Sequence, residues 1–451
     1  MSNPKDRPGQ TTVDGEGLRK NSFGTDVVRY VDHGDVCPQR KWMSPMLERL
    51  RELLPYGTRT VLDLVRGRYP SFVYGSERLT GQVPVFCFHS VEPESFEATL
   101  HFLARNDYYT LTPDELVDWI LGRADLPHER SVLLTFDDGH GSFWSVAYPL
   151  LRRFDMRATV FLVPTLIEDR QDDLPTLEDA QQGTANLETV LSREDGPQPY
   201  LTWNEISEMA SSGALNFETH SYEHSLIFTS PKIVDFVRLN LREKYDPLEF
   251  RIAAARGNPP TVGDLPMGVP LYTTAPRLSG ETRYFDDVGL REACANFVAE
   301  HGGERFFDRR DWNRQLRSFV ESYRERHTLE DEYESPQETR MSIRRDLAHS
   351  IEAIEERPAL GPVNFLALPW NRGSAMAVSE ARDLGLRGCF WENPNGRCIN
   401  ERGQDPFYLR RMGSDFLPLL LGDGRDTLVS LFIKKLKRRL ETPSPHLTHH
   451  G

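Results

Sequence analysis

The chain has 451 residues, of which 54 are Lys or Arg and 68 are Asp or Glu, so its formal net charge is −14 at pH 7. This length accommodates one large domain or two to three smaller ones, and the negative charge argues against nucleic acid as the main partner. The five cysteines include no CxxC pair, so the sequence predicts neither a disulfide framework nor a thiolate zinc site.

The N-terminal region carries no targeting signal in its sequence pattern. Residues 1–22 are polar and charged without an apolar core, and no apolar run approaches the ~18 residues needed to cross a bilayer. We therefore expect a soluble, cytoplasmic protein. Residues 1–22 are expected to be disordered, and a helical pattern between 42 and 68 completes an N-terminal extension over 1–82.

From residue 83 the strand and helix signals alternate. Strands are predicted at 83–88, 131–136, 158–163 and 215–219. Helices are predicted near 96–103, from Thr112 to Gly122, over 142–154 and from Thr202 to Gly213. This alternation over 83–229 predicts α/β architecture with a parallel sheet or barrel, in which active groups lie at the C-terminal ends of strands.

The pattern breaks over 230–340, which we interpret as an insertion with two helices, 288–300 and 312–327. Alternation resumes over 341–425, with helices at 341–357 and 375–384 and strands at 363–368 and 388–391. The tail, 426–451, contains a basic amphipathic stretch at 428–440. A solvated helix is favoured there, and peripheral contact with an anionic membrane is the alternative.

Two motifs carry the chemistry. Asp137 and Asp138 follow the apolar run 131–136, and paired carboxylates are costly to bury without a function. His220 and His224 follow a second apolar run, 214–217, at a spacing that lets both rings reach one point. One carboxylate with two histidines is an open zinc set, and the second carboxylate can act as a base, which predicts a metal-dependent hydrolase. The alternative is a helix cap beside surface histidines.

These motifs resemble those of polysaccharide deacetylases of the NodB-homology type, carbohydrate esterase family four. The resemblance rests on TFDDG at 135–139, RATVFLVP at 157–164 and the segment 201–225, and it extends loosely over 341–413. It implies a distorted (β/α)7-type barrel. It also implies that Asp138, His220 and His224 hold a divalent metal, with Asp137 as general base. Zinc is the expected ion, with manganese, cobalt or nickel as alternatives.

Other site residues are expected from weaker similarities to motifs of the same family. His89, in FCFHS, resembles an early element of exopolysaccharide N-deacetylases and would be the acid; a structural histidine is the alternative. Trp370 follows Pro369 as in the third family motif, and its ring would form a wall of the sugar site. The alternative is that Trp370 is an ordinary residue of the apolar core. No arginine precedes this motif, so Arg372 is a candidate substitute. Arg410, in the late LRRM element, is expected to support the carboxylates.

The predicted function is removal of an N-acetyl group from an amino sugar in a polysaccharide or glycan precursor, with a carbohydrate as substrate. An amidohydrolase acting on a non-sugar C–N bond is the second hypothesis. A degenerate glycan-binding module is the third, supported by the altered third motif and the missing late Leu-x-His element. The oligomeric state is left open.

Overall fold

The computed structural model describes residues 66–76, 79, 81–170, 174–196, 199–239, 265–327, 332–392 and 398–441. The chain divides into two compact units, 1–62 and 63–451, and every described residue belongs to the second. The predicted disordered start and nearly all of the helical pattern at 42–68 therefore lie outside the described residues. The described part begins with a short 3-10 helix, Ser71–Tyr74.

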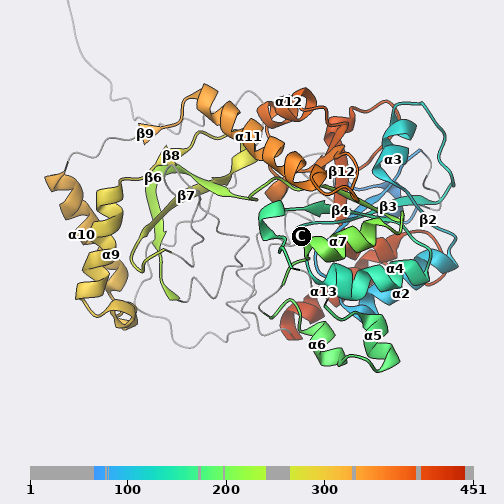
Figure 1. Cartoon of the computed structure of the whole chain (residues 1–451), viewed down its shortest axis with the longest axis horizontal. Coiled ribbons are helices and arrows are strands. Elements are labelled where there is room, and N and C mark those ends of the chain that lie inside the picture. The colour runs from blue at the N-terminus through green and yellow to red at the C-terminus, as the bar shows by residue number, and fades with distance from the viewer. Residues whose placement is uncertain are drawn as a thin grey trace, which may run out of the picture. The chain divides into compact units, whose positions relative to one another are not determined.

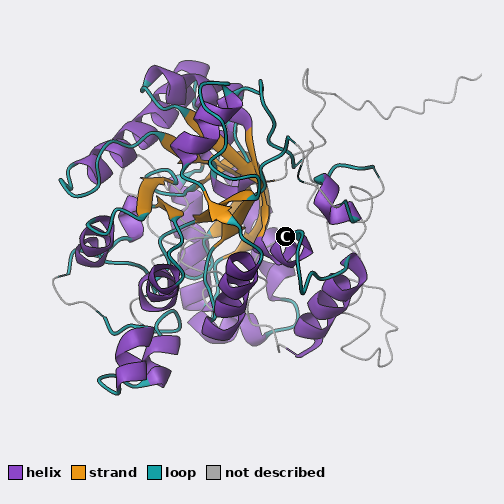
Figure 2. Ribbon diagram, turned by 90° about the vertical axis from the view of Figure 1, so that its right-hand side faces the viewer, coloured by secondary structure: helices purple, strands orange, loops and turns teal. Residues whose placement is uncertain are grey.

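Seven parallel strands form a closed barrel in the described chain (Figure 2). They are β1 (Val85–Phe88), β3 (Ser131–Phe136), β4 (Ala158–Leu162), β5 (Leu215–Thr219), β10 (Phe365–Ala367), β11 (Gly388–Glu392) and β12 (Leu409–Gly413). Their order is β1-β12-β11-β10-β5-β4-β3, and pairing of β1 with β3 closes the ring. The short strand β2 (Tyr109–Thr110) pairs with the first two residues of β3. The predicted α/β barrel of the (β/α)7 type is thus confirmed.

Helices link the strands and surround them (Figure 2). Those of the barrel are α2 (Pro93–Arg105), α3 (Pro113–Ile120), α4 (Tyr148–Arg153), α5 (Leu177–Gln182), α6 (Leu187–Leu191), α7 (Trp203–Ala210), α11 (Pro336–Glu355) and α12 (Ala375–Asp383). The capping boxes predicted for α3 and α7 are both present. A third capping box, from Ser335 to Glu338, starts α11 before the predicted residue 341. A π-helical turn, Phe143–Ala147, replaces the first part of the predicted helix 142–154.

Alternation along the strands separates two apolar cores. Val85, Leu133 and Leu409 belong to a cluster that fills the barrel and includes residues of α3. Their neighbours Phe86 and Leu134 belong to the larger cluster between the strands and the helices. Successive side chains of a strand point to opposite faces, so this alternation also decides which polar residues face the barrel interior.

The segment between β5 and α11 forms elements outside the barrel sheet (Figure 1). It contains the antiparallel pairs β6 (Leu226–Phe236) with β7 (Pro270–Pro276) and β8 (Tyr284–Phe285) with β9 (Glu332–Tyr333), and helices α9 (Val288–Glu300) and α10 (Trp312–Arg326). Two apolar clusters of its own pack these elements. Both predicted helices are present, whereas the strands were not predicted, and β6 begins at Leu226 rather than at residue 230.

The basic C-terminal stretch is helical, as predicted: α13 spans Leu428–Glu441. Leu431 is buried, while Val429 and Ile433 are exposed. Lys434 pairs with Asp426 at 2.6 Å. Across the described part of the chain, no helix combines the length and the apolar character required to cross a membrane.

Candidate active site

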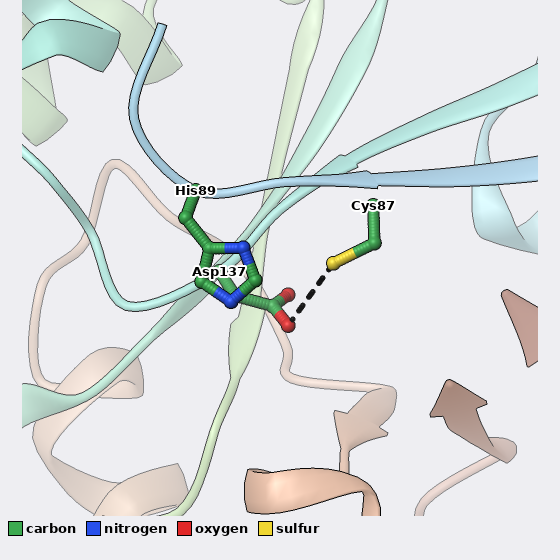
Figure 3. Close-up of side chains that lie close together, drawn as sticks. All are labelled: Cys87, His89 and Asp137. Atoms are coloured by element: carbon green, nitrogen blue, oxygen red, sulfur yellow. Dashed lines mark hydrogen bonds between the residues drawn. The ribbon is translucent and has the colours of Figure 1, made fainter. Parts of the chain in front are cut away.

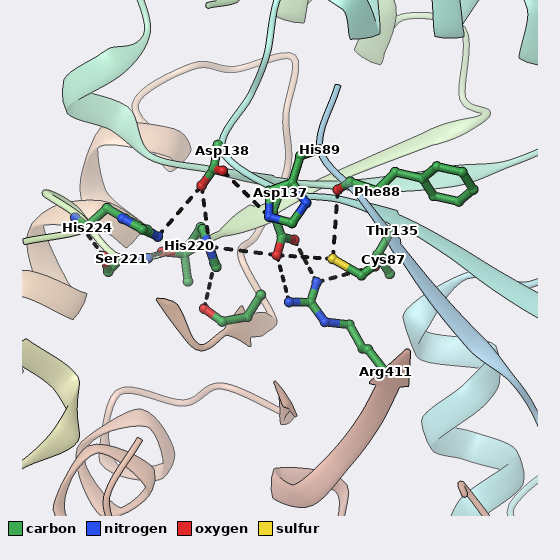
Figure 4. A network of polar contacts seen from close by, with 12 residues as sticks. Cys87, Phe88, His89, Thr135, Asp137, Asp138, His220, Ser221, His224 and Arg411 are labelled. Atoms are coloured by element: carbon green, nitrogen blue, oxygen red, sulfur yellow. Dashed lines mark hydrogen bonds and ion pairs between the residues drawn. The ribbon is translucent and has the colours of Figure 1, made fainter. Parts of the chain in front are cut away.

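Polar side chains from several strand ends meet at one mouth of the barrel (Figure 4). Asp137 and Asp138 follow β3, His220 follows β5, and His89 follows β1. Parallel strands place their C-terminal ends at the same edge, so residues far apart in sequence converge there. Asp137, Asp138 and His220 are 3%, 5% and 2% exposed, which is unusual for such polar groups and requires that they contact one another or a ligand.

Three donor atoms lie close together, one each from Asp138, His220 and His224. Asp138 Oδ1 lies 3.5 Å from His220 Nε2 and 3.8 Å from His224 Nε2. Ligands at the usual zinc distances in a tetrahedron are about 3.4 Å apart, so the spacing fits one ion between them. Asp138 Oδ1 is buried and has no hydrogen-bond partner within the described chain. A buried, unpartnered carboxylate oxygen facing two imidazole nitrogens fits a divalent cation.

The Nε2 atoms of both histidines face Asp138 Oδ1. His220 Nδ1 lies 2.9 Å from the carbonyl oxygen of Ala367, so the Nδ1–H group donates a hydrogen bond to this oxygen and Nε2 keeps its lone pair. Burial lowers the pKa of His224 to about 4, against the opposing charge of Asp138, so this ring is neutral near pH 7. Neutral imidazole is the form that binds metals.

Asp137 is held by a buried arginine. Arg411 donates from its two terminal nitrogens to Asp137 Oδ1 and Oδ2, at 2.6 and 2.7 Å. The Cys87 thiol also donates to Oδ2, at 3.4 Å, and the His89 ring lies in front of the carboxylate (Figure 3). Burial alone would raise the pKa of Asp137, but Arg411 and His220 outweigh it and lower the pKa to about 2. Asp137 is therefore ionised.

The expected role of Arg410 needs correction. Arg411 supports the carboxylate, and Arg410, next to it in β12, has its side chain on the opposite face of the strand. Arg372, the candidate substitute in the third motif, is exposed to solvent. Arg411, and not an arginine of the third motif, pairs with Asp137.

Two further histidines flank Asp138. His89 Nε2 and His140 Nε2 lie 3.8 and 3.7 Å from Asp138 Oδ2, and the two side chains are 21% and 14% exposed. Burial opposes ionisation of Asp138, but His140, His224 and the other histidines hold its pKa well below the usual range. His89 lies at the mouth where it was predicted. His140 directly follows the Asp-Asp-Gly motif, and this position is the sequence signal that points to it.

Trp370 packs against His224. Its ring centroid is 5.1 Å from that of His224, and its φ of 56° is in the left-handed region. The ring is half-buried and its Nε1 is buried without a hydrogen-bond partner in the described chain. The residue thus lies beside the candidate ligands and is not enclosed in the apolar core. Glu218, which lies two residues before His220, does not face the candidate ligands. Its carboxylate accepts hydrogen bonds from the backbone N–H groups of Asn364 and Phe365.

The fold and the site together define a seven-stranded α/β barrel with a carboxylate and histidine cluster at one mouth. Residues 125–268 match the family model described as polysaccharide deacetylase, and this region contains Asp137, Asp138, His220 and His224. This match confirms the resemblance found in the motifs.

Curated relatives agree with the family match. The chain is 28% identical over 151 residues to a putative polysaccharide deacetylase, YxkH, of Bacillus subtilis, covering 32% of this chain and 43% of that protein. It is 25% identical over 171 residues to a poly-beta-1,6-N-acetyl-D-glucosamine N-deacetylase of Staphylococcus aureus, covering 36% of this chain and 50% of that protein. The chain thus spans half or less of the length of these relatives.

A solved de-N-acetylase structure from Aggregatibacter actinomycetemcomitans aligns over 78% of this chain and 99% of that one, at 16% identity and a TM-score of 0.42. The barrel itself follows from the strand pairing described above.

Proposed function

We propose that the protein is a metal-dependent hydrolase that removes an N-acetyl group from an amino sugar of a polysaccharide or glycan precursor. One observation carries the proposal: the unpartnered Oδ1 of Asp138 faces His220 Nε2 and His224 Nε2 while the adjacent Asp137 is kept ionised by Arg411. The family match over 125–268 supports the deacetylase chemistry.

Asp138, His220 and His224 would hold the ion, which by its donor set is zinc, with manganese, cobalt or nickel as alternatives. When bound, a divalent cation supplies positive charge that polarises an amide carbonyl and acidifies a water molecule. Among the described residues, the cluster carries two carboxylates and one permanent cation, Arg411, so an added cation also balances the charge of the site.

The remaining groups divide the proton transfers between them. Asp137 accepts the proton of the water that attacks the acetyl carbonyl, and its pairing with Arg411 fixes the direction of the carboxylate. His89, partly exposed at the mouth, donates a proton to the departing nitrogen. The carbon–nitrogen bond breaks, a carbon–oxygen bond forms, and the products are acetate and a free amine.

Trp370 provides an aromatic surface beside this centre. Its ring is half-buried and packs against His224, and a sugar ring would lie on the exposed part of the indole. The substrate carbohydrate would reach the centre from this side.

The test combines metal content with acetate release. Metal per chain is measured by elemental analysis on wild type and on the His220→Ala/His224→Ala double variant, and acetate release is measured with N-acetylglucosamine oligomers. We expect stoichiometric metal and acetate release in wild type only. A double variant of two exposed histidines, His301→Ala/His327→Ala, is the matched control and should behave as wild type.

The other outcomes separate the remaining hypotheses. Metal without acetate release would favour hydrolysis of a non-sugar C–N bond. Wild-type protein without metal would overturn the proposal and favour the glycan-binding module. A cytoplasmic location and contact of α13 with an anionic membrane remain predictions.

A further inference from the structure

In the loop that carries His220 and His224, every backbone N–H from residue 220 to residue 224 donates a hydrogen bond. Two of these bonds go to side chains of the loop itself: Ser221 N–H donates to Thr219 Oγ1 at 3.1 Å and His224 N–H to Ser221 Oγ at 3.0 Å. His220 N–H donates to the carbonyl oxygen of Leu162, at 2.8 Å. The two amides in the middle, those of Tyr222 and Glu223, donate to a residue from outside the loop.

Asp346 accepts both of these amides from helix α11. Its Oδ2 accepts from Tyr222 N–H at 3.2 Å and its Oδ1 accepts from Glu223 N–H at 3.3 Å. Consecutive N–H groups that converge after a left-handed residue form a concave anion site, and Ser221, with φ of 70°, is that residue. The anion in this site is therefore a carboxylate that comes from a position 124 residues later in the chain.

The same face of α11 touches the loop at two further points. Ser350, one helical turn after Asp346, places its Oγ 2.5 Å from Thr219 Oγ1. The ring of His349 meets that of Tyr222 edge to face, with centroids 5.6 Å apart. One helix face thus contacts the segment immediately before His220 and the segment between the two histidines.

This support is needed because the loop conformation is an unfavourable one. Ser221 and His224 both have positive φ, at 70° and 52°, and neither is glycine. Such residues persist only where the surroundings hold them. If the central amides lost their acceptor, the loop would relax, and the two Nε2 atoms would no longer keep their present distances to Asp138 Oδ1.

We propose that Asp346 is a positioning residue of the metal centre, which sets the separation of His220 and His224 through the backbone between them. The inference rests on the proposed function, since it assumes that these histidines are metal ligands. The contact of Asp346 with the loop also connects the segment between β5 and α11 with the metal centre. This segment leaves the barrel two residues after His224 and leads directly into α11.

The test measures metal affinity and not activity alone. Zinc dissociation constants are determined by competition with a chromophoric chelator for wild type, Asp346→Asn and Asp346→Glu. The matched control is Glu352→Gln, the same chemical change at an exposed position of α11. Because burial raises the pKa of Asp346 to about 7, the measurements are made at pH 8, where its carboxylate is ionised.

We expect Asp346→Asn to weaken zinc binding about 10- to 100-fold, since the amide N–H₂ cannot accept from the second backbone N–H. Asp346→Glu keeps a carboxylate and should lie between Asp346→Asn and wild type, and Glu352→Gln should match wild type. At saturating metal, KM for the acetylated oligomer should change less than the zinc dissociation constant. A purely structural role would instead lower the melting temperature of the metal-free protein and leave the zinc affinity of the folded fraction unchanged.

The outcomes distinguish this inference from the proposed function. Wild type that binds no zinc would overturn the proposed function, whatever the variants do. Wild type that binds zinc, with Asp346→Asn within twofold of it, would overturn only the role of Asp346. If Asp346→Asn does not fold, Ser350→Ala removes the neighbouring contact of the same helix face. Zinc binding weakened severalfold in that variant supports the inference, and unchanged binding overturns it.

Discussion

Arg411 and Asp137 are joined by two hydrogen bonds, of 2.6 and 2.7 Å, although 274 residues separate them in the sequence. Arg411 is 1% exposed and Asp137 3%, so both charges are removed from water. The pair connects the last strand of the barrel with the end of β3, and the same interaction keeps the proposed base ionised. One contact therefore ties β12 to the end of β3 and also sets the electrostatics of the site.

Replacing Arg411 by glutamine should destabilise the protein strongly. The change leaves the carboxylate of Asp137 buried without its counter-charge, and breaking a buried ion pair in this way costs about 3–5 kcal/mol. The free energy of unfolding would be measured by urea denaturation. Arg410→Gln is the control, since its side chain lies on the other face of β12, and it should cost less than about 1 kcal/mol. Equal losses in both variants would contradict the assigned pairing.

The stability of the metal-free protein should fall as the pH drops from about 4 to 2. The pKa of Asp137 is about 2 in the folded state and 3.8 without the surroundings of the fold, so its contribution is present above pH 4. That contribution is lost as the pH falls through the folded-state value, and it amounts to about 2 kcal/mol. With chelator present, the difference between wild type and Arg411→Gln should narrow over this range. A constant difference would show that Asp137 titrates normally.

His89→Gln should reduce kcat by about 100- to 10,000-fold, the usual contribution of a general acid, without loss of bound metal. Metal content and acetate release would be measured on the same preparation. His140→Gln is the comparison, because His140 lies at a similar distance from Asp138 but is less exposed. A large loss in His140→Gln with a small loss in His89→Gln would assign the acid to His140.

Gly139→Ala should cost more stability than Gly213→Ala. Both glycines have left-handed φ, at 76° and 70°, so an added Cβ introduces a similar backbone strain of about 1 kcal/mol in each. At Gly213 the Cβ meets nothing within 4 Å, whereas at Gly139 it would lie 2.9 Å from Ile167 Cδ1. Melting temperatures of the two variants provide the measurement. Since Asp138 precedes Gly139, we also expect weaker metal binding in Gly139→Ala alone.

The strands and the polar residues that follow them could be predicted because each signal is local. The apolar run 131–136 ends at two carboxylates, and the run before Thr219 ends at a histidine. In a parallel barrel such ends must meet, so sequence spacing alone indicated which residues lie together. His89 was placed by the same reasoning.

The choice between Arg410 and Arg411 could not be made from the sequence. Both lie in a short strand between apolar residues, Leu409 and Met412, and these belong to opposite faces. Alternation then fits either arginine until the register with neighbouring strands is known. The strand β6 was missed for a related reason: it contains a proline and two register irregularities, so it lacks a period-two pattern. Asp346 gave no sequence signal, because an acidic residue in a helix usually faces solvent.

Strands β5 and β10 are paired through few residues, which affects the order in which the barrel strands assemble. One register pair, Leu366 with Thr219, joins these strands in the described chain, and the Glu218 carboxylate supplements it across 146 residues by accepting the amide of Asn364. Closing a loop of this length costs little more free energy than closing a shorter one. The loop must nevertheless close before the contacts between the two strands can stabilise the protein. We therefore expect β3, β4 and β5 to assemble early and the ring to close last. Until then, Phe161 and Phe365 of the barrel interior would be accessible to water and to other unfolded chains.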